Sequence, residues 1–212
     1  MAYGENIRQL NPLEPQQLAQ TLERFCPQGG RVLDVGCGRG TTLSWLARHT
    51  AYQVQGLEPD PDYAALCGAV QGLAQQLPFA ERSFDAVLME CVFSLLDQGE
   101  LAAGEVWRVL RPGGVLLLSD LYARQGQAQL GDNRLLRHIY AAEDLSGFFT
   151  RIGFTQAEFI DHSFALKSLL AQMIMDGAAC ACLDPDSRQI LRQVRAGYGL
   201  WAFVKPGGAG ES

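Results

Sequence analysis

The residues best suited to chemistry are acids and glycines placed where apolar segments end. The segment Arg31 to Thr42 reads RVLDVGCGRGTT, so three glycines follow a short apolar run that contains Asp34. Glycines let a backbone turn tightly and approach a ligand without intervening Cβ atoms. A loop that opens a helix also presents unpaired amide groups, which favour the charged end of a small ligand. This segment therefore predicts a nucleotide-type cofactor site.

The spacing of the glycines indicates which cofactor is bound. A dinucleotide fingerprint needs G-x-G-x-x-G, but Thr41 occupies the third glycine position and Gly40 comes one residue early. This argues against NAD and FAD. The fixed negative charge of Asp34 would repel a pyrophosphate but can hold an ammonium group. S-adenosylmethionine carries such a group.

The pattern V-L-D-x-G-x-G-x-G resembles the first motif of the class I S-adenosylmethionine-dependent methyltransferases. GLAQQLPFAERSFDAVLMECVFSLL (72–96) is similar to that family's G-D-A-x-x-L-P-F-x-x-x-S-F-D segment, and EVWRVLRPGG (105–114) to its E-x-x-R-V-L-K-P-G-G helix exit. The matches cover about residues 30 to 120. In the last of them we interpret the glycines as ending a helix and the arginine as a surface residue.

The resemblance implies a set of cofactor residues. Asp34 and the glycine loop would bind the methionine end, Glu58 the two ribose hydroxyls, and Ala74 with Gln75 the adenine. Leu73 stands where the family usually has an adenine-binding Asp, so that carboxylate contact is absent. The full set of expected cofactor-binding residues is Asp34, Gly36, Cys37, Gly38, Gly40, Glu58, Pro59, Leu73, Ala74, Gln75 and Glu90. The product would be S-adenosyl-L-homocysteine.

Continuous apolar strands that alternate with helices predict an α/β fold. We expect a Rossmann-like, mostly parallel twisted sheet with helices on both faces, an antiparallel last strand, and a helical insertion between the last two strands. The chain would form one domain, divided into an N-terminal helical cap (1–29), a cofactor-binding core (30–162), the insertion (163–197), a last strand (198–205) and a disordered tail (206–212). A helix is predicted over 97–111, with Asp97 and Glu100 as a capping box.

Composition narrows the possible partners. The 212 residues carry a net charge of −6 and no basic cluster, so nucleic acid is not expected. The N-terminus lacks the apolar core of a signal peptide and no run is long enough to span a bilayer, which predicts a cytoplasmic protein without a membrane partner. Its six cysteines are expected to be reduced. The sequence contains no C-x-x-C pair, so a structural zinc site of the usual spacing is not expected. A monomer and a homodimer are both compatible with the sequence.

The methyl acceptor is expected to be a small molecule. Tyr122 and His138 follow the strand that ends at Asp120, and His138 is a candidate base near neutral pH. The segment around Cys91 also resembles arsenite methyltransferases, in which a cysteine at this place coordinates the metalloid. If the insertion folds over the site, Cys91, Cys180 and Cys182 could converge on a soft acceptor, meaning a thiol, arsenic or selenium. Otherwise these cysteines are small buried residues.

We therefore predict an S-adenosylmethionine-dependent methyltransferase with Cys91, His138 and Tyr122 as candidate catalytic residues. Two alternatives remain. The first is a non-enzymatic S-adenosylmethionine-binding module, which the missing adenine aspartate favours slightly. The second is an NAD-dependent oxidoreductase, which Thr41 disfavours.

Overall fold

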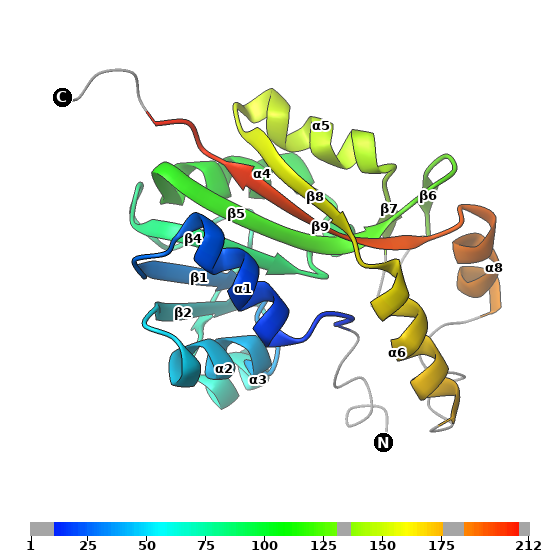
Figure 1. Cartoon of the computed structure of the whole chain (residues 1–212), viewed down its shortest axis with the longest axis horizontal. Helices are drawn as coiled ribbons and strands as arrows, with labels where there is room; N and C mark the ends of the chain where they lie inside the picture. Colours follow the sequence, from blue (N-terminus) through cyan, green and yellow to red (C-terminus); the bar gives the residue numbers. More distant parts are fainter. Residues whose placement is uncertain (1–10, 131–136, 176–184, 208–212) are drawn as a thin grey trace.

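A seven-stranded sheet in the order β3-β2-β1-β4-β5-β9-β8 forms the centre of the protein (Figure 1). The computed structural model describes residues 11–130, 137–175 and 185–207. Strands β1 to β5 run parallel, whereas β9 is antiparallel to both of its neighbours. The predicted Rossmann-like sheet with an antiparallel last strand is confirmed. The strands are β1 (Arg31–Val35), β2 (Gln53–Glu58), β3 (Val70–Gln71), β4 (Phe84–Glu90), β5 (Leu110–Tyr122), β8 (Thr155–Asp161) and β9 (Gly197–Val204), with β6 (Ala128–Gln129) and β7 (His138–Ile139) forming a separate short pair.

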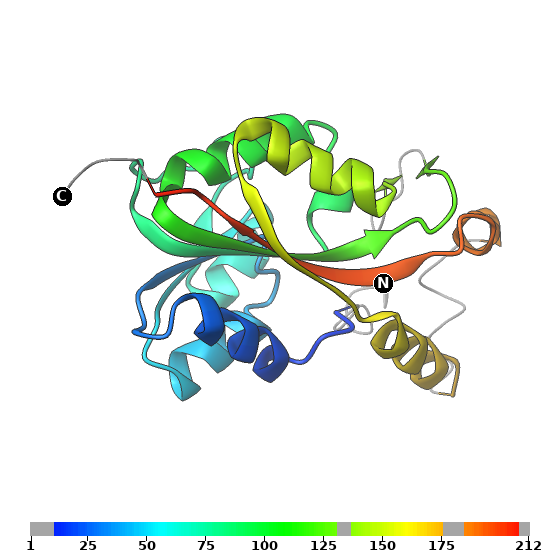
Figure 2. The same cartoon turned by 45° about the horizontal axis from the view of Figure 1, so that its top comes forward.

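Helices cover both faces of the sheet. Figure 2 shows α4 and α5 on one face and α1 with α2 on the other. Successive residues of the central strands alternate between two hydrophobic clusters: Val87 packs with α4 and α5, whereas Ala86 and Leu88 pack on the side of α1. This is why the central strands are apolar along their whole length. The helices are α1 (Pro15–Phe25), α2 (Thr41–His49), α3 (Pro61–Cys67), η1 (Phe93–Leu95, a 3₁₀ turn), α4 (Gly99–Val109), α5 (Ala142–Ile152), α6 (Ser163–Met175) and α8 (Pro185–Gln193).

A side-chain cap is present at the start of α3, but the cap predicted for α4 is absent. Asp60 caps α3 by accepting from the amides of Asp62 (2.9 Å) and Tyr63 (3.2 Å). The predicted capping box of α4 is wrong, since the helix begins at Gly99 and its N-cap residue makes no side-chain hydrogen bond. The carboxylate of Asp97 pairs instead with Arg137. The cap is therefore replaced by a contact with a residue that lies far away in the sequence.

The sequence predicts that Pro112-Gly113-Gly114 separates α4 from β5. In the structure these three residues belong to β5 instead. Leu110 already pairs with Phe84, and the register between β4 and β5 shifts before Val115 pairs with Ala86. The three residues thus form a bulged start of β5. A bulge accommodates extra residues in one strand without ending the pairing.

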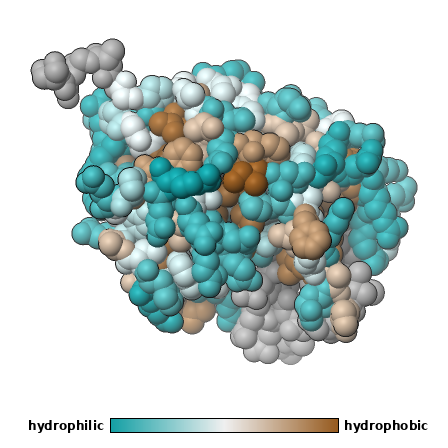
Figure 3. Space-filling view, viewed as in Figure 1, coloured by the Kyte–Doolittle hydropathy of each residue, from teal (hydrophilic) through white to brown (hydrophobic). Residues whose placement is uncertain are grey.

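Two described helices, α6 and α8, lie between β8 and β9 (Figures 1 and 2). Leu166 of α6 packs against the cluster that includes α1, but Phe164 and Met175 are 83% and 82% exposed. Figure 3 shows a mainly hydrophilic face on which apolar side chains gather along β8 and β9 and near the start of α6. None of the helices within the described residues is long and apolar enough to cross a membrane. The predicted sites Cys180 and Cys182, the tail beyond 207 and the first ten residues lie outside the described ranges.

Candidate functional site

Four acids gather at one edge of the sheet because they sit at or near the carboxyl ends of parallel strands. Asp34 belongs to β1, Glu58 ends β2, Glu90 ends β4, and Asp120 lies near the end of β5. Asp34, Glu58 and Asp120 are buried, with exposed fractions of 2%, 7% and 1%. This edge therefore concentrates carboxyl groups within the protein rather than in solvent.

The glycine-rich loop between β1 and α2 borders these acids. Gly36, Gly38 and Gly40 all have positive φ, at 70°, 54° and 75°. A Cβ on Gly36 would lie 2.5 Å from Val92 Cγ2, and one on Gly40 would lie 2.4 Å from Cys67 Cβ, whereas one on Gly38 would meet no atom within 4 Å. Two of the glycines are thus required by close packing and the third leaves open space beside the backbone.

Glu58 holds this loop in place. Its Oε2 accepts from the amide of Gly38 (2.8 Å) and its Oε1 accepts from the amide of Asp60 (3.1 Å). Gly40 is the N-cap of α2 and supplies no side-chain cap, so the first amides of the helix are not satisfied by the cap residue. The carboxylate retains further lone pairs with which to accept hydrogen bonds from a ligand.

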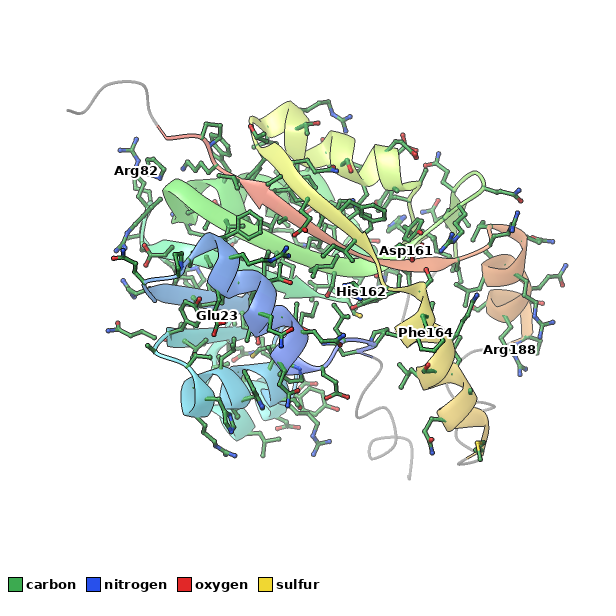
Figure 4. The ribbon with its side chains drawn as sticks, in the orientation of Figure 1. Glu23, Arg82, Asp161, His162, Phe164 and Arg188 are labelled. Atoms are coloured by element: carbon green, nitrogen blue, oxygen red, sulfur yellow. The ribbon has the colours of Figure 1, made fainter. Side chains whose placement is uncertain are left out.

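A pocket of about 770 Å³ opens beside the loop. Its walls come from the segment before α1, the glycine loop, the end of β4, and α6. Figure 4 shows Phe164 at the first turn of α6, next to the β8–α6 junction marked by Asp161 and His162. The lining residues are Asn11, Pro12, Leu13, Glu14, Pro15, Gln17, Asp34, Gly36, Cys37, Gly38, Arg39, Thr41, Thr42, Tyr63, Glu90, Cys91, Phe164, Ala165, Ser168, Leu169 and Gln172.

The pocket favours a positively charged ligand group at its inner end. Burial raises the pKa of Asp34 well above its ordinary value, and the negative charges of Glu90 and Glu58 raise it further. Burial also raises the pKa of Glu90, although hydrogen bonds from Asn11 and Thr42 oppose this. Arg39 is the one basic side chain among the described lining residues, and its guanidinium lies over the Tyr63 ring. A ligand cation between Asp34 and Glu90 would relieve the repulsion.

Cys91 follows β4 with a φ of 55°, a conformation that costs a non-glycine residue free energy and is frequent at functional sites. Its Sγ lies 3.3 Å from the Tyr198 hydroxyl, which is also within hydrogen-bond distance of Ser119 Oγ (3.0 Å) and Asn11 Oδ1 (3.1 Å). Asn11 in turn donates from Nδ2 to Glu90. This chain of contacts joins the N-terminal segment to β4, β5 and β9.

Only part of the predicted set lines the pocket. Asp34, Gly36, Cys37, Gly38 and Glu90 do so, together with Cys91. The backbone amide of Gly72 donates to the carbonyl of Glu58 (3.1 Å), which places the segment that follows it beside the end of β2. The predicted cofactor residues outside the lining are Gly40, Glu58, Pro59, Leu73, Ala74 and Gln75.

The other two candidate catalytic residues lie outside the lining of the pocket to which Cys91 belongs. Tyr122 is buried, and its ring packs edge-on against Phe159 and Trp201 at 5.7 Å and 5.9 Å between ring centroids. His138 stacks on Tyr140, and its Nε2 lies 3.6 Å from Asp97 Oδ1, beyond hydrogen-bond distance. Neither residue lines the pocket. The structure therefore does not bring the three candidates together.

Arg108 supports the segment on the expected adenine side, a role that the sequence did not reveal. It was expected to be a surface arginine, but its guanidinium donates to the carbonyls of Phe79 (2.7 Å) and Leu77 (2.9 Å) and pairs with Glu105 at 2.8 Å. Glu105 also accepts from the Leu77 amide at 2.7 Å. Glu105 and Arg108 lie three residues apart on one face of α4, so together they hold the segment 77–79 (the LPF segment) in place.

Comparison with known proteins places the central part of the chain in one family. A model described as a methyltransferase domain matches residues 33–118. The fatty-acid O-methyltransferase of Mycolicibacterium smegmatis is 37% identical over 126 residues, which are 55% of this chain and 46% of that protein. Methyltransferase GfsG of Streptomyces halstedii is 32% identical over 163 residues, 61% of this chain and 58% of that protein. The chain spans about half the length of these curated relatives.

A solved structure shares the fold. Phosphoethanolamine N-methyltransferase 2 of Haemonchus contortus, in complex with S-adenosyl-L-methionine, has a TM-score of 0.71 at 20% identity, covering 96% of this chain and 55% of that one. At this identity the likeness concerns the fold alone.

The buried carboxyl of Asp120 predicts a pH-dependent stability. Burial raises the pKa of Asp120 to about 6, although the amides of Ser94 and Leu121 donate to it. In the unfolded chain an aspartate titrates near pH ~3.9, so between about pH 4 and pH 6 the folded state binds more protons than the unfolded state. The free energy of unfolding of the wild-type protein should therefore rise, relative to that of Asp120→Asn, as the pH falls through this window. Urea denaturation at several pH values measures the difference, and a difference that is constant or has the opposite slope would contradict this assignment.

Proposed function

Because the chain belongs to the class I S-adenosylmethionine-dependent methyltransferases, we propose that it transfers a methyl group from S-adenosylmethionine to a small-molecule acceptor. The observation that carries the proposal is the pocket in which Asp34 and Glu90 meet the glycine loop. Its inner end is suited to positive charge, and its outer wall, formed by α6 and the segment before α1, leaves room for a second molecule.

The residues present fit the methyl donor. Amides at the start of α2 can donate hydrogen bonds to the carboxylate of S-adenosylmethionine, and Asp34 with Glu90 can balance its ammonium and sulfonium charges. Glu58 would accept hydrogen bonds from the ribose hydroxyls, and the segment after Gly72 would border the adenine. When bound, the donor supplies an electrophilic methyl on sulfur, so the protein's task is alignment and water exclusion.

The chain's own contacts provide this alignment. Asn11 donates to Glu90 and lies beside Tyr198, which holds the N-terminal segment over the methionine end of the pocket. Leu169 and Phe164 of α6 provide an apolar wall opposite. We propose that the acceptor binds against this wall, next to Cys91, and that it carries an apolar portion. The relative that methylates a fatty acid is consistent with such an acceptor.

A soft acceptor is a second candidate, favoured by the position of Cys91 in the pocket wall. Burial, followed by the negative charge of Asp120, raises the pKa of the Cys91 thiol, so the thiolate that binds soft centres is disfavoured near neutral pH. Among the described residues no group of three potential ligands could hold a metal ion.

Replacing Cys91 separates the two candidate acceptors. If the acceptor is soft, turnover that depends on arsenite or selenite should be detected with the wild-type protein and lost in Cys91→Ser, because an alcohol does not replace a thiolate at a soft centre. If the acceptor binds through the apolar wall, neither compound should support turnover. Methyl transfer from labelled S-adenosylmethionine measures the turnover with arsenite and with selenite. Equal arsenite-dependent turnover in the wild-type protein and in Cys91→Ser would exclude Cys91 as a ligand.

Glu58→Gln tests the donor site. Loss of the negative charge should weaken S-adenosylmethionine binding at least about tenfold, since hydrogen bonds to charged groups contribute roughly 1.5–3 kcal/mol. Isothermal titration measures the affinity. Glu23→Gln is the matched control, because Glu23 lies exposed on α1 (Figure 4), whereas Glu58 accepts from the Gly38 amide of the glycine loop.

The outcomes distinguish the competing functions. No binding to the wild-type protein, or stabilisation by NAD but not by S-adenosylmethionine, would contradict the proposal. Unchanged affinity in Glu58→Gln would remove this residue from the donor site. Binding without any transfer of labelled methyl to acceptors of a crude lysate would indicate a binding module instead.

A further inference from the structure

Two cysteines lie beside each other at the glycine loop. Cys37 is in the loop and lines the pocket, and Cys67 is the last residue of α3. Their sulfur atoms are 3.8 Å apart although thirty positions separate them in the sequence. Both are partly exposed. A dithiol thus connects the loop with the neighbouring helix.

Close packing keeps the two thiols near each other. Cys67 Cβ occupies the space beside Gly40, where an added Cβ would be only 2.4 Å away, and Cys37 Sγ occupies the space beside Gly56, where an added Cβ would be 2.8 Å away. Cys67 Sγ also lies 3.2 Å from the Tyr63 carbonyl oxygen. Neither side chain has much freedom to leave its neighbour.

We propose that Cys37 and Cys67 form a modification site, a reversible disulfide made by low-molecular-weight disulfides such as glutathione disulfide, that displaces the glycine loop and weakens methyl-donor binding. The first part stands on the geometry of the two thiols. The second part rests on the proposed function, because it needs the loop to bind the donor.

The exchange balances without any other reactant. The Cys67 thiolate attacks one sulfur of glutathione disulfide, forming a mixed disulfide and releasing one glutathione thiolate. The Cys37 sulfur then attacks Cys67, forming the protein disulfide and releasing the second thiolate. The two protons of the protein thiols go to the two glutathione thiolates, so the protein loses two electrons and glutathione disulfide gains them. We assign the first attack to Cys67 because burial and the nearby charge of Asp34 raise the pKa of Cys37.

We expect bond formation to shift the loop or α3, because close packing at Gly40 and Gly56 restricts both side chains. A disulfide needs its sulfurs about 2.05 Å apart, so they must approach by roughly 1.8 Å. The Cys37 backbone is fixed by its amide, which donates to the Leu57 carbonyl (3.1 Å), and by its carbonyl, which accepts from the Gly40 amide (2.9 Å). The neighbouring Gly38 amide donates to Glu58. A shift of Cys37 therefore disturbs the same contacts that shape the donor site.

The first experiment tests the bond alone. The full chain is incubated with glutathione disulfide and analysed by intact mass and by peptide mapping without reduction. We expect a mass loss of about 2 Da and a cross-linked peptide pair containing Cys37 and Cys67, both reversed by dithiothreitol. Cys67→Ser, or Cys67→Ala if the serine variant does not fold, should lose this pair. Cys26→Ser should keep it, because that thiol lies after α1 and faces the Asp85 carbonyl. Failure to find the pair in the wild-type protein would overturn the proposal.

The second experiment tests the consequence. Oxidised wild-type protein should bind S-adenosylmethionine more weakly than reduced protein, and dithiothreitol should restore the affinity. Cys67→Ser treated with the same oxidant should bind like reduced wild type. Equal affinity of the oxidised and reduced wild-type protein would refute control of the loop. If reduced protein binds no S-adenosylmethionine, the proposed function fails instead, and the mapped disulfide still decides whether the modification site exists.

Discussion

Burial of the Asp34 carboxyl beside those of Glu90 and Glu58 is the constraint on which the pocket depends. Asp34 and Glu90 are desolvated, and the negative charge of Glu90 adds to the cost of ionising Asp34. The groups that support Glu90 are the hydrogen-bond donors Asn11 and Thr42. Burying like charges together costs stability unless a cation or a proton balances them. A ligand with positive charge at this point would convert that cost into binding free energy.

The sheet topology makes this crowding unavoidable. In the parallel register, Asp34 of β1 lies between Gly56 of β2 and Leu88 of β4. The strand ends that follow these residues carry Glu58 and Glu90, so the acids converge at one edge. Glu58 accepts from the Gly38 amide of the loop and from the Asp60 amide, which couples the position of the loop to this carboxylate. Fold and electrostatics therefore cannot be separated at this edge.

The parts of the site that follow from local sequence were predictable. The RVLDVGCGRG segment contains both the strand and the positive-φ glycines of the loop, and Glu58 ends the next strand. The N-terminal cap and the insertion were expected as candidates to cover the site, but the contacts of the wall opposite the loop were not predictable, because they connect distant segments. The Tyr198 hydroxyl donates to Asn11 Oδ1 although 187 positions separate the two residues, and no short sequence pattern predicts such a contact.

The dependence on distant segments also explains two incorrect predictions around α4. Asp97 has the spacing of a helix cap, but its pairing with Arg137 competes with that role. Arg108 has the pattern of an exposed helix residue, yet it braces the LPF segment through the Leu77 and Phe79 carbonyls. In both cases a charged side chain found a partner in tertiary structure that the local sequence does not specify.

Proton release on binding shows whether a ligand cation balances the carboxyl groups of Asp34 and Glu90. S-adenosylmethionine is titrated into the protein by calorimetry in two buffers of different ionisation enthalpy, at several values between about pH 5 and pH 8. If the ligand's positive charge balances Asp34 and Glu90, it lowers their pKa values, so binding should release protons and Asp34→Asn should release fewer. Proton uptake, or binding without any proton release across this range, would contradict the account.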